Sequence, residues 1–439
     1  MEHLLLVFSV LGTLNKLYLG IWYNKMPKQT FVWVCNRKNP VTKNFGRVLK
    51  ISNEGNLVIL GGENVMWSSN ILVSDVTIES PVAVLMHYIL KNRNEAVLWQ
   101  SFDYPTDTLL PGMKIGLNFI TGHDYHLTSW KDYENPEPGP YSLSMDHRGP
   151  IQFVIRNMSD IYMRSNAWDG STFIAGFLNH SRLTMYNTVD VNDAEMYLTL
   201  SISQFRIVLI PTGDVNVVYW VENSNMWILL RDVASNECMH YNRRGAFGIC
   251  ERGSSPPYCN CLPGFRPHSQ NDWDMRNWSG GCVRHKELTC DERNEFLRLE
   301  RVKGPDYSVT FTDLSMKECE MKCLWNCSCA AYAYVNSTMI CLVWAGKLID
   351  ISDHFDGFDL YVRADETGLG NKFSLSSTGH STSFINPRNW RIWVVLVLCI
   401  TVAFVSLGSI YYRRTRNKKR RKTNRLGFVV IRCSHRLNI

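Results

Sequence analysis

The 439-residue sequence predicts a mainly β, extracellular chain with one membrane-spanning helix near its C-terminus. Three observations lead to this prediction: short alternating apolar runs, a cysteine-rich stretch and one long uncharged apolar segment. From Leu17 to about Leu117 the runs are separated by glycine and asparagine at about ten-residue spacing, and no helical period persists. This pattern is typical of all-β domains.

The segment from Ile392 to Tyr412 contains 21 residues without a charge. A helix of this length crosses a bilayer core of about 30 Å. Tryptophan and tyrosine lie at its two edges, and a dense lysine and arginine cluster follows it. The positive-inside rule therefore predicts a transmembrane helix over 391–412 with residues 1–390 outside the cell. The alternative is a buried core helix followed by a nuclear-localisation or nucleic-acid patch, which fits these flanks less well.

The net charge of +7 suggests a nucleic-acid binder at first sight. However, residues 391–439 hold twelve Lys/Arg and no Asp/Glu, so residues 1–390 hold 35 basic and 40 acidic residues, a net of −5. The basic character belongs to the tail 413–439, where it can attract anionic membrane lipids. No nucleic-acid partner is predicted.

Most of the 14 cysteines fall between Cys238 and Cys341. Closely spaced extracellular cysteines indicate disulfides. Zinc is the alternative for the pairs Cys259/Cys261 and Cys327/Cys329. Five N-glycosylation sequons on the predicted outer side favour an oxidising, secreted context instead, and neither a metal nor a cofactor is predicted. The sequons begin at Asn157, Asn179, Asn277, Asn326 and Asn336.

An extracellular chain needs a signal for secretion. Residues 1–14 are a weak candidate, because Leu4–Leu11 forms a short apolar run while the preceding residues contain no Lys or Arg. The alternative for this run is an ordinary strand.

Several long motifs carry a resemblance to a known family. They are "YLGIWYNKMPKQTFVWVCNRKNPV", "ISNEGNLVIL", "VLWQSFDYPTDTLLPGMKIG", "LTSWKDYENPEPGPYSL" and, later, "DLSMKECEMKCLWNCSCAAYAYVN". The sequence resembles the plant S-locus glycoprotein and S-domain (G-type lectin) receptor-like kinase family over roughly 15–422. The resemblance implies a bulb-type lectin β-prism of three small sheets, followed by the family's other modules in their usual order.

The predicted modules follow that order. They are a partial bulb-type lectin-like domain (15–120), a β-rich S-locus glycoprotein region (121–234), a disulfide-rich EGF-like module (235–285), a PAN/apple module (286–364), a juxtamembrane linker (365–390), the transmembrane helix (391–412) and a basic cytoplasmic tail (413–439).

The PAN stretch can also be interpreted from its residues. Ser315 and Glu318 form a capping box that opens a helix. Cys319, Cys323 and Cys327 recur every four residues, which places them on one helix face and favours bridges to other segments. The family resemblance implies Cys319–Cys341 and Cys323–Cys329, and spacing alone leaves the connectivity open.

The sequence departs from the family at its start and in its sugar motif. The family has about fifty further residues before "YLGIWY", so the β-prism is expected to lack its first strands and to have an unpaired edge. Bulb-type lectins bind mannose through Gln-x-Asp-x-Asn-x-Val-x-Tyr. The corresponding residues here are Ser52, Glu54, Asn56, Val58 and Leu60. Because most of the polar partners are replaced, a structural role is preferred over carbohydrate binding. A second copy near 84–92 is not recognisable.

The EGF-like module departs in one cysteine. Arg244 stands where the family has Cys. The pairs that the resemblance implies, Cys238–Cys250 and Cys261–Cys282, remain possible, but Cys259 lacks the cysteine that pairs with it in the family. Cys35 stands where the family usually has Ala. The hypothesis is that Cys35 and Cys259 are thiols or form an intermolecular bridge.

The residues after Lys422 contain none of the kinase motifs that the family's enzymes carry, and a tail of this size cannot bury a domain core. No Walker A, His-Glu-x-x-His or Gly-x-Ser-x-Gly motif is present either. The lone Cys433 is a candidate for palmitoylation but is more simply an inert thiol. The chain itself is therefore not predicted to be an enzyme.

The prediction is a single-pass type I plasma-membrane glycoprotein. The resemblance implies recognition of an extracellular peptide or glycan ligand, of the pollen-recognition, self-incompatibility or defence type. It also implies pairing as a homodimer or with full-length S-domain receptor kinases. Two alternatives stay open: a fragment of a membrane serine/threonine kinase, and a decaying copy of a receptor gene.

Overall fold

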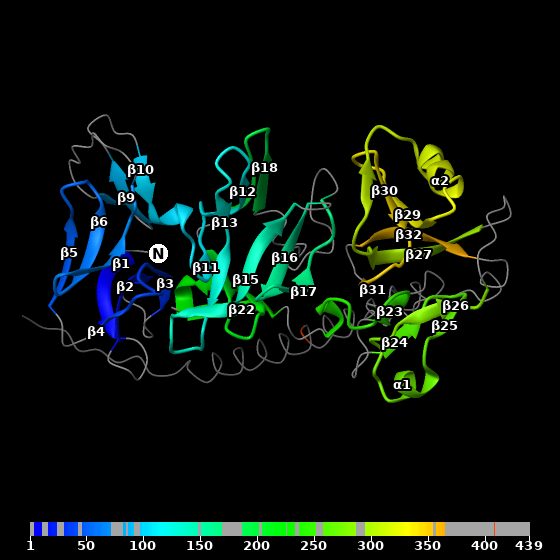
Figure 1. Cartoon of the computed structure of the whole chain (residues 1–439), viewed down its shortest axis with the longest axis horizontal. Coiled ribbons are helices and arrows are strands. Elements are labelled where there is room, and N and C mark those ends of the chain that lie inside the picture. The colour runs from blue at the N-terminus through cyan, green and yellow to red at the C-terminus, as the bar shows by residue number, and fades with distance from the viewer. Residues whose placement is uncertain are drawn as a thin grey trace, which may run out of the picture. The chain divides into compact units, whose positions relative to one another are not determined.

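The computed structural model describes residues 4–10, 16–23, 30–42, 46–71, 82–84, 87–91, 97–147, 151–168, 187–201, 204–224, 226–232, 237–251, 258–286, 295–353 and 357–364, with Gly408. By its internal contacts the chain divides into a unit of residues 1–373 and a second unit of 374–439. Everything below concerns the first unit (Figure 1).

The described residues between 4 and 100 form three small antiparallel sheets. The first has the order β1-β2-β3 with β4 beside β2, the second β5-β6-β7 and the third β10-β9-β8. Three small sheets are the arrangement that the family resemblance implies. The strands are β1 (Leu4–Val10), β2 (Lys16–Tyr23), β3 (Phe31–Val34), β4 (Val41–Thr42), β5 (Arg47–Ile51), β6 (Leu57–Gly61), β7 (Asn64–Ser68), β8 (Val82–Val84), β9 (His87–Lys91) and β10 (Val97–Gln100).

The apolar run near the N-terminus is a strand in this structure. All seven residues of β1 pair with β2, from Leu4 opposite Tyr23 to Val10 opposite Leu17. Of the two interpretations of this run, the structure shows the ordinary strand, Leu4–Val10. Strand β1 covers one edge of β2 but is itself the end strand of this sheet among the described residues, so the expected unpaired edge stays a prediction. A short apolar run carries no period that would separate a strand from a signal segment.

A second group of three sheets follows, each with four strands: β11-β20-β21-β22, β13-β12-β19-β18 and β14-β15-β16-β17. The strands are β11 (Thr108–Leu109), β12 (Lys114–Asn118), β13 (Asp124–Tyr125), β14 (Leu127–Trp130), β15 (Pro138–Asp146), β16 (Gln152–Asn157), β17 (Asp160–Arg164), β18 (Asn187–Val191), β19 (Glu195–Leu200), β20 (Phe205–Leu209), β21 (Val215–Val221) and β22 (Met226–Asp232).

Two strands inside the predicted lectin-like range 15–120 pair with strands far along the chain. Strands β11 and β12 pair with β20 and β19, about 80 to 100 residues further along the chain. By their pairing they lie in the sheets of the second group, and the predicted boundary at residue 120 stays a prediction. Long-range pairing of this kind leaves no local signal in the sequence.

The described part of 237–364 contains one eight-stranded sheet, in the order β24-β23-β31-β27-β32-β29-β30-β28, and the small pair β25-β26. Helix α2 packs on β29 and β30 (Figure 1). The elements are β23 (Gly248–Glu251), β24 (Tyr258–Cys261), β25 (Phe265–Pro267), α1 (Gln270–Asp274), β26 (Cys282–Arg284), β27 (Glu295–Lys303), β28 (Val309–Phe311), α2 (Met316–Leu324), β29 (Cys329–Val335), β30 (Ile340–Ala345), β31 (Ile351–Asp353) and β32 (Phe358–Ala364).

The predicted EGF-like and PAN modules share this large sheet. Strand β23 pairs in parallel with β31, with Ile249 opposite Ile351 and Cys250 opposite Ser352. The two modules are thus joined by backbone hydrogen bonds as well as by side chains.

One hydrophobic core serves both groups of small sheets. Trp33, Leu57 and Trp99 of the first group lie in the same buried cluster as Ile115 and Phe153 of the second. Polar contacts reinforce this junction, because the guanidinium of the buried Arg37 donates to the carbonyl oxygens of Thr128 and Pro136 at 2.9 and 2.6 Å.

Glu137 adds an ion pair at the same junction and predicts a pH dependence. Hydrogen bonds from Lys16 and from Lys131 lower the pKa of Glu137 to about 2, from an ordinary value of 4.5. A depressed carboxyl pKa contributes stability above the unfolded value, and that contribution is lost as the pH falls toward the folded value. We expect Glu137→Gln to destabilise the protein at pH 6, with a difference that shrinks between about pH 4.5 and 2.

Urea unfolding of wild type and Glu137→Gln across this pH range measures the difference. Glu134→Gln is the matched control, because Glu134 is exposed in the same loop. A wild-type advantage that stays constant down to about pH 2 would contradict the assigned role of the Glu137 carboxylate.

Among the described residues, no helix has the length and apolar character to span a membrane. The predicted span 391–412 lies outside the described residues apart from Gly408, as do the linker 365–390 and the tail 413–439.

Candidate recognition modules and their disulfide framework

Helix α2 begins as the sequence predicts. The Ser315 hydroxyl accepts a hydrogen bond from the Glu318 backbone N–H, and the Glu318 carboxylate accepts one from the Ser315 backbone N–H at 2.8 Å. This reciprocal capping satisfies N–H groups that have no partner within the helix.

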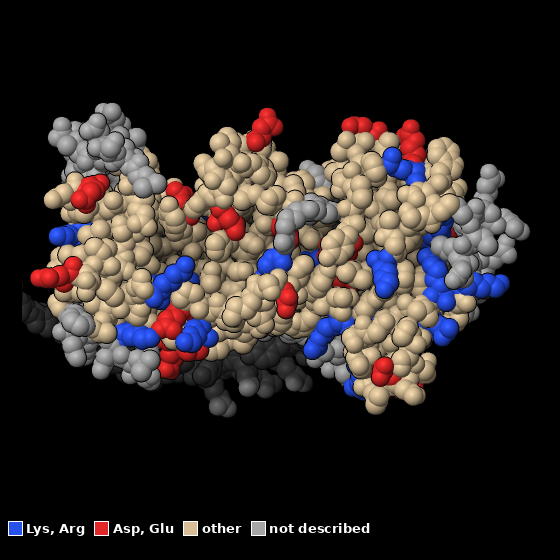
Figure 2. All heavy atoms as spheres, in the orientation of Figure 1, with Lys and Arg blue, Asp and Glu red and all other residues tan. Residues whose placement is uncertain are grey.

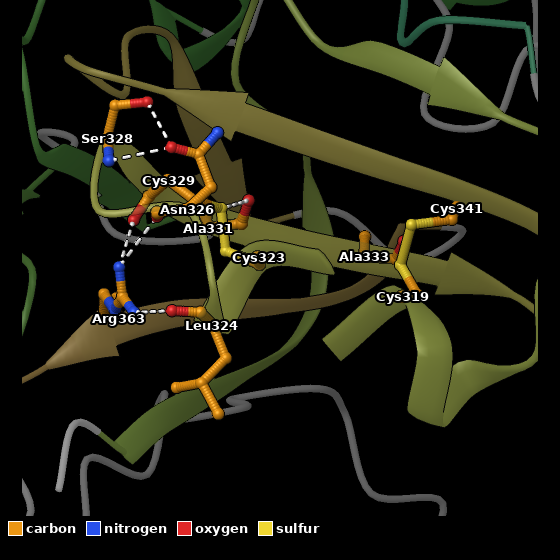
Figure 3. The surroundings of a disulfide bond; sticks show 10 residues. All are labelled: Cys319, Cys323, Leu324, Asn326, Ser328, Cys329, Ala331, Ala333, Cys341 and Arg363. Atoms are coloured by element: carbon orange, nitrogen blue, oxygen red, sulfur yellow. Dashed lines mark hydrogen bonds between the residues drawn. A yellow bond between two sulfur atoms is a disulfide. The ribbon is translucent and has the colours of Figure 1, made fainter. Parts of the chain in front are cut away.

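Two buried disulfides hold this helix on the sheet (Figure 3). Cys319 is joined to Cys341 of β30, and Cys323 to Cys329 of β29. These are the pairs that the family resemblance implies. Cys327 is also disulfide-bonded, but it lies beyond the helix, which ends at Leu324. The predicted helical face of three cysteines therefore consists of two.

Arg363 completes the support of the helix end. Its buried guanidinium donates to the carbonyl oxygens of Leu324, Asn326 and Cys329 (Figure 3). A cation at a helix C-terminus satisfies terminal carbonyls and interacts favourably with the helix dipole. Arg363 thus fixes the loop that carries the Cys323–Cys329 bridge.

The EGF-like part contains the disulfides Cys238–Cys250 and Cys261–Cys282. Because Cys261, Cys327 and Cys329 are in disulfides, the zinc alternative for the two Cys-x-Cys pairs is wrong. Within the described ranges, no group of three or more His, Cys, Asp or Glu side chains is arranged to hold a metal.

Cys35 and Cys259 are thiols in the structure. Cys259 is buried beside the Cys238–Cys250 bridge, which leaves little surface for a bridge to another chain. Burial raises the pKa of the Cys35 thiol, so its reactive thiolate is disfavoured at neutral pH. The thiol form of the hypothesis agrees with this geometry better than the intermolecular bridge does.

Arg244 takes over a structural role at the position of the missing cysteine. Its guanidinium is buried and donates to the carbonyl oxygens of Ile351 at 3.0 Å, Cys238 at 2.6 Å and His240 at 3.1 Å. The contact with Ile351 reaches β31, so Arg244 connects the EGF-like part with the PAN-like part.

Arg244 belongs to a buried group of charges that we call the Asp350 cluster. Its members are Arg164, Arg244, Lys303, Asp306 and Asp350. The Asp350 carboxylate lies 2.6 Å from Lys303 Nζ, 2.9 Å from Arg164 Nε and 3.8 Å from Arg244 Nη2. The side chains of these four residues are at most 1 % exposed. The cluster therefore joins the S-locus region, the EGF-like part and the PAN-like part.

Burial and charge act in opposite directions on these groups. Burial would raise the pKa of Asp350, but Lys303, Arg164 and Arg244 together hold it below its ordinary value. Burial lowers the pKa of Lys303 to about 8, against the opposing effect of Asp350. No motif marks Arg164, Lys303, Asp306 or Asp350 in the sequence, and only Arg244 was visible as a departure from the family.

The residues at the degenerate sugar motif lie together on the β5–β6 hairpin. The Asn56 amide oxygen accepts hydrogen bonds from Ser69 Oγ at 3.0 Å and from the Ile71 backbone N–H, and Asn56 N–H donates to Ser52 Oγ. Val58 is buried and Glu54 is exposed. Since the Asn56 side chain is engaged by the chain itself, the contacts favour the structural role for these residues.

Four of the five sequon asparagines are described, and all four are exposed: Asn157, Asn277, Asn326 and Asn336. Asn179 lies outside the described residues. On the face that Figure 2 shows, the charged side chains form small groups, some of mixed sign, on a mostly uncharged surface.

Together, the two groups of three small sheets and the disulfide-linked helix-on-sheet module define a multi-module protein of the lectin-like extracellular class. Three family models match in the same order: "D-mannose binding lectin" over 30–131, "S-locus glycoprotein domain" over 163–269 and "PAN-like domain" over 290–351. The chain belongs to the family of S-locus glycoproteins and G-type lectin S-receptor-like kinases.

Two kinds of relative share this sequence. The S-locus-specific glycoprotein BS29-2 of Brassica oleracea is 35% identical over 370 residues, which cover 80% of this chain and 83% of that protein. A G-type lectin S-receptor-like serine/threonine-protein kinase of Arabidopsis thaliana is 36% identical over 381 residues, which cover 83% of this chain and 44% of the kinase. The chain thus spans less than half the length of its kinase relatives.

Proposed function

We propose that this chain is a cell-surface recognition protein that binds an extracellular peptide or glycan ligand. One observation carries the proposal: the matched region covers 83% of an S-locus-specific glycoprotein but only 44% of a receptor-like kinase. The three chains therefore share a region that makes up most of the S-locus-specific glycoprotein and less than half of the kinase.

The surface for ligand recognition would come from the two groups of small sheets, outside the Ser52–Val58 hairpin whose Asn56 amide is already engaged. The PAN-like part would support pairing, either with a second copy or with a full-length S-domain receptor kinase. The apolar segment 391–412 would anchor the chain, and the basic tail would contact inner-leaflet lipid. The S-locus relatives favour a recognition role of the pollen or self-incompatibility type.

The second candidate is a fragment of a membrane serine/threonine kinase. It is favoured by the 44% coverage of the kinase relatives. Long-read sequencing of the transcript separates the two candidates: reads that continue in frame into kinase motifs support the fragment, and reads that end after Ile439 support the recognition protein.

Expression in plant cells with one tag inserted within residues 252–257 and a second tag after Ile439 tests the first candidate. We expect antibody to label the first tag on intact cells and the C-terminal tag only after permeabilisation. A differently tagged second copy, or a full-length S-domain kinase, should co-purify with the chain. C-terminal labelling on intact cells would overturn the orientation, and recovery as a lone monomer would overturn the pairing.

A further inference from the structure

A cavity of about 350 Å³ lies in the PAN-like part, at the small end of the range of about 300–1,000 Å³ for ligand pockets. Its walls come from the start of α2, the end of β29 with the turn that follows it, and β32. The lining residues are Met316, Tyr334, Val335, Asn336, Ser337, Gly357, Phe358, Asp359 and Tyr361.

Two of the lining residues belong to a sequon. Asn336, Ser337 and Thr338 form the tight turn between β29 and β30. Asn336 is exposed, as an acceptor of N-glycosylation must be. A glycan on Asn336 would therefore begin at the edge of the cavity.

The cavity combines aromatic walls with fixed polar groups. The Tyr361 ring stacks on Tyr332 at 4.8 Å, and the Phe358 ring stacks on Trp344 at 6.0 Å. These contacts hold two half-buried rings in place, and such pre-organisation lowers the entropic cost of binding.

The polar group at the rim is the Asp359 carboxylate. One of its oxygens accepts from Arg298 at 2.6 Å and the other from the Arg301 backbone N–H at 3.2 Å. Carboxylate oxygens have further acceptor sites, so Asp359 can also accept a hydroxyl or amide hydrogen from a ligand.

We propose that this cavity holds the first sugar of the glycan attached to Asn336. An N-acetylglucosamine ring has an apolar face for the tyrosine and phenylalanine walls and polar edges for Asp359. The short covalent link gives an effective concentration on the order of mM, so weak contacts suffice. The inference rests on the secretory location that is part of the proposed function.

The test compares enzymatic release of two glycans from the folded protein. The full chain is expressed in plant cells, and native membranes are treated with a peptide N-glycosidase. Isotope labelling then reports release at Asn336 and at the exposed control site Asn277. If the docked form is populated at about 90%, release at Asn336 is about tenfold slower than at Asn277 in the native protein, and equally fast after denaturation.

Two variants separate the cavity from the turn as the cause of slow release. Tyr361→Ala removes an aromatic wall of the cavity. Met316→Ala removes a side chain that is 40% exposed, so this variant is expected to fold even if Tyr361→Ala does not. Both are expected to bring release at Asn336 close to the rate at Asn277.

The outcomes are distinct. Slow release at Asn336 that the variants relieve supports the inference. An unmodified Asn336 beside a glycosylated Asn277, equal native rates, or slow release that neither variant changes would each overturn it without affecting the proposed function. The absence of glycan at every sequon would overturn both.

Discussion

Replacing Asp350 by Asn is expected to lower the free energy of unfolding by about 3–5 kcal/mol, the usual cost of removing one partner from a buried ionic group. The substitution keeps the shape of the side chain but removes its charge. Three buried cations, Arg164, Arg244 and Lys303, would then face a neutral amide. The remaining anion, Asp306, lies 4.0 Å from Arg164 and already accepts from Gln152 and Tyr241.

Urea unfolding of a secreted form with residues 1–390 measures this effect. Asp353→Asn is the matched control, because Asp353 ends β31, the strand that directly follows Asp350, and is only partly buried. A substitution outside such a network usually changes stability by no more than about 0.5 kcal/mol. If Asp350→Asn costs no more than Asp353→Asn, the charge of Asp350 does not hold the three parts together.

The same cluster offers an internal check through Lys303. The variant Lys303→Met has one buried cation fewer that depends on the Asp350 carboxylate. Asp350→Asn should therefore lower the free energy of unfolding by less in the Lys303→Met variant than in the wild type. Between about pH 8 and 10.5 the unfolded chain binds more protons at Lys303 than the folded one, so this residue makes stability rise with pH. Asp350 opposes that trend by stabilising the charged amine.

The features that the sequence predicts correctly are local ones. The capping box needs only Ser315 and Glu318, three residues apart, and the structure contains both of its hydrogen bonds. The alternating runs predict strands for the same reason, because a period of two is visible within a few residues. The resemblance to the family extends this to the order of modules and to the two bridges of the PAN-like part.

The features that the sequence does not predict depend on residues far apart along the chain. Asp350 meets Arg164 across 186 residues and Arg244 across more than 100. Nothing near Asp350 distinguishes it from an exposed loop aspartate. Arg244 appeared only as a lost cysteine, yet its long side chain reaches three carbonyl groups that a cysteine cannot reach. Local patterns carry no information about such partners.

The two bridges of the PAN-like part differ in the length of chain that they close. Cys319–Cys341 spans 22 residues and Cys323–Cys329 spans 6. All four cysteines are buried, and both bridges leave the same helix. They therefore form a matched pair in which loop length is the main difference.

Replacing each pair of cysteines by alanine is expected to destabilise the protein by about 3.4 kcal/mol for Cys319/Cys341 and about 2.2 kcal/mol for Cys323/Cys329, because the longer bridge removes more entropy from the unfolded chain. Double substitution leaves no unpaired thiol that could form other bridges.

Urea unfolding of the 1–390 form measures the loss in free energy of unfolding for each double variant. Native hydrogen exchange at the backbone amides of α2 shows whether the loss of each disulfide destabilises this helix. Arg363 still holds the end of α2 in both variants, so the helix should survive with faster exchange. Equal losses, or a larger loss for the short bridge, would mean that native packing around Cys323 and Cys329 outweighs chain entropy in this module.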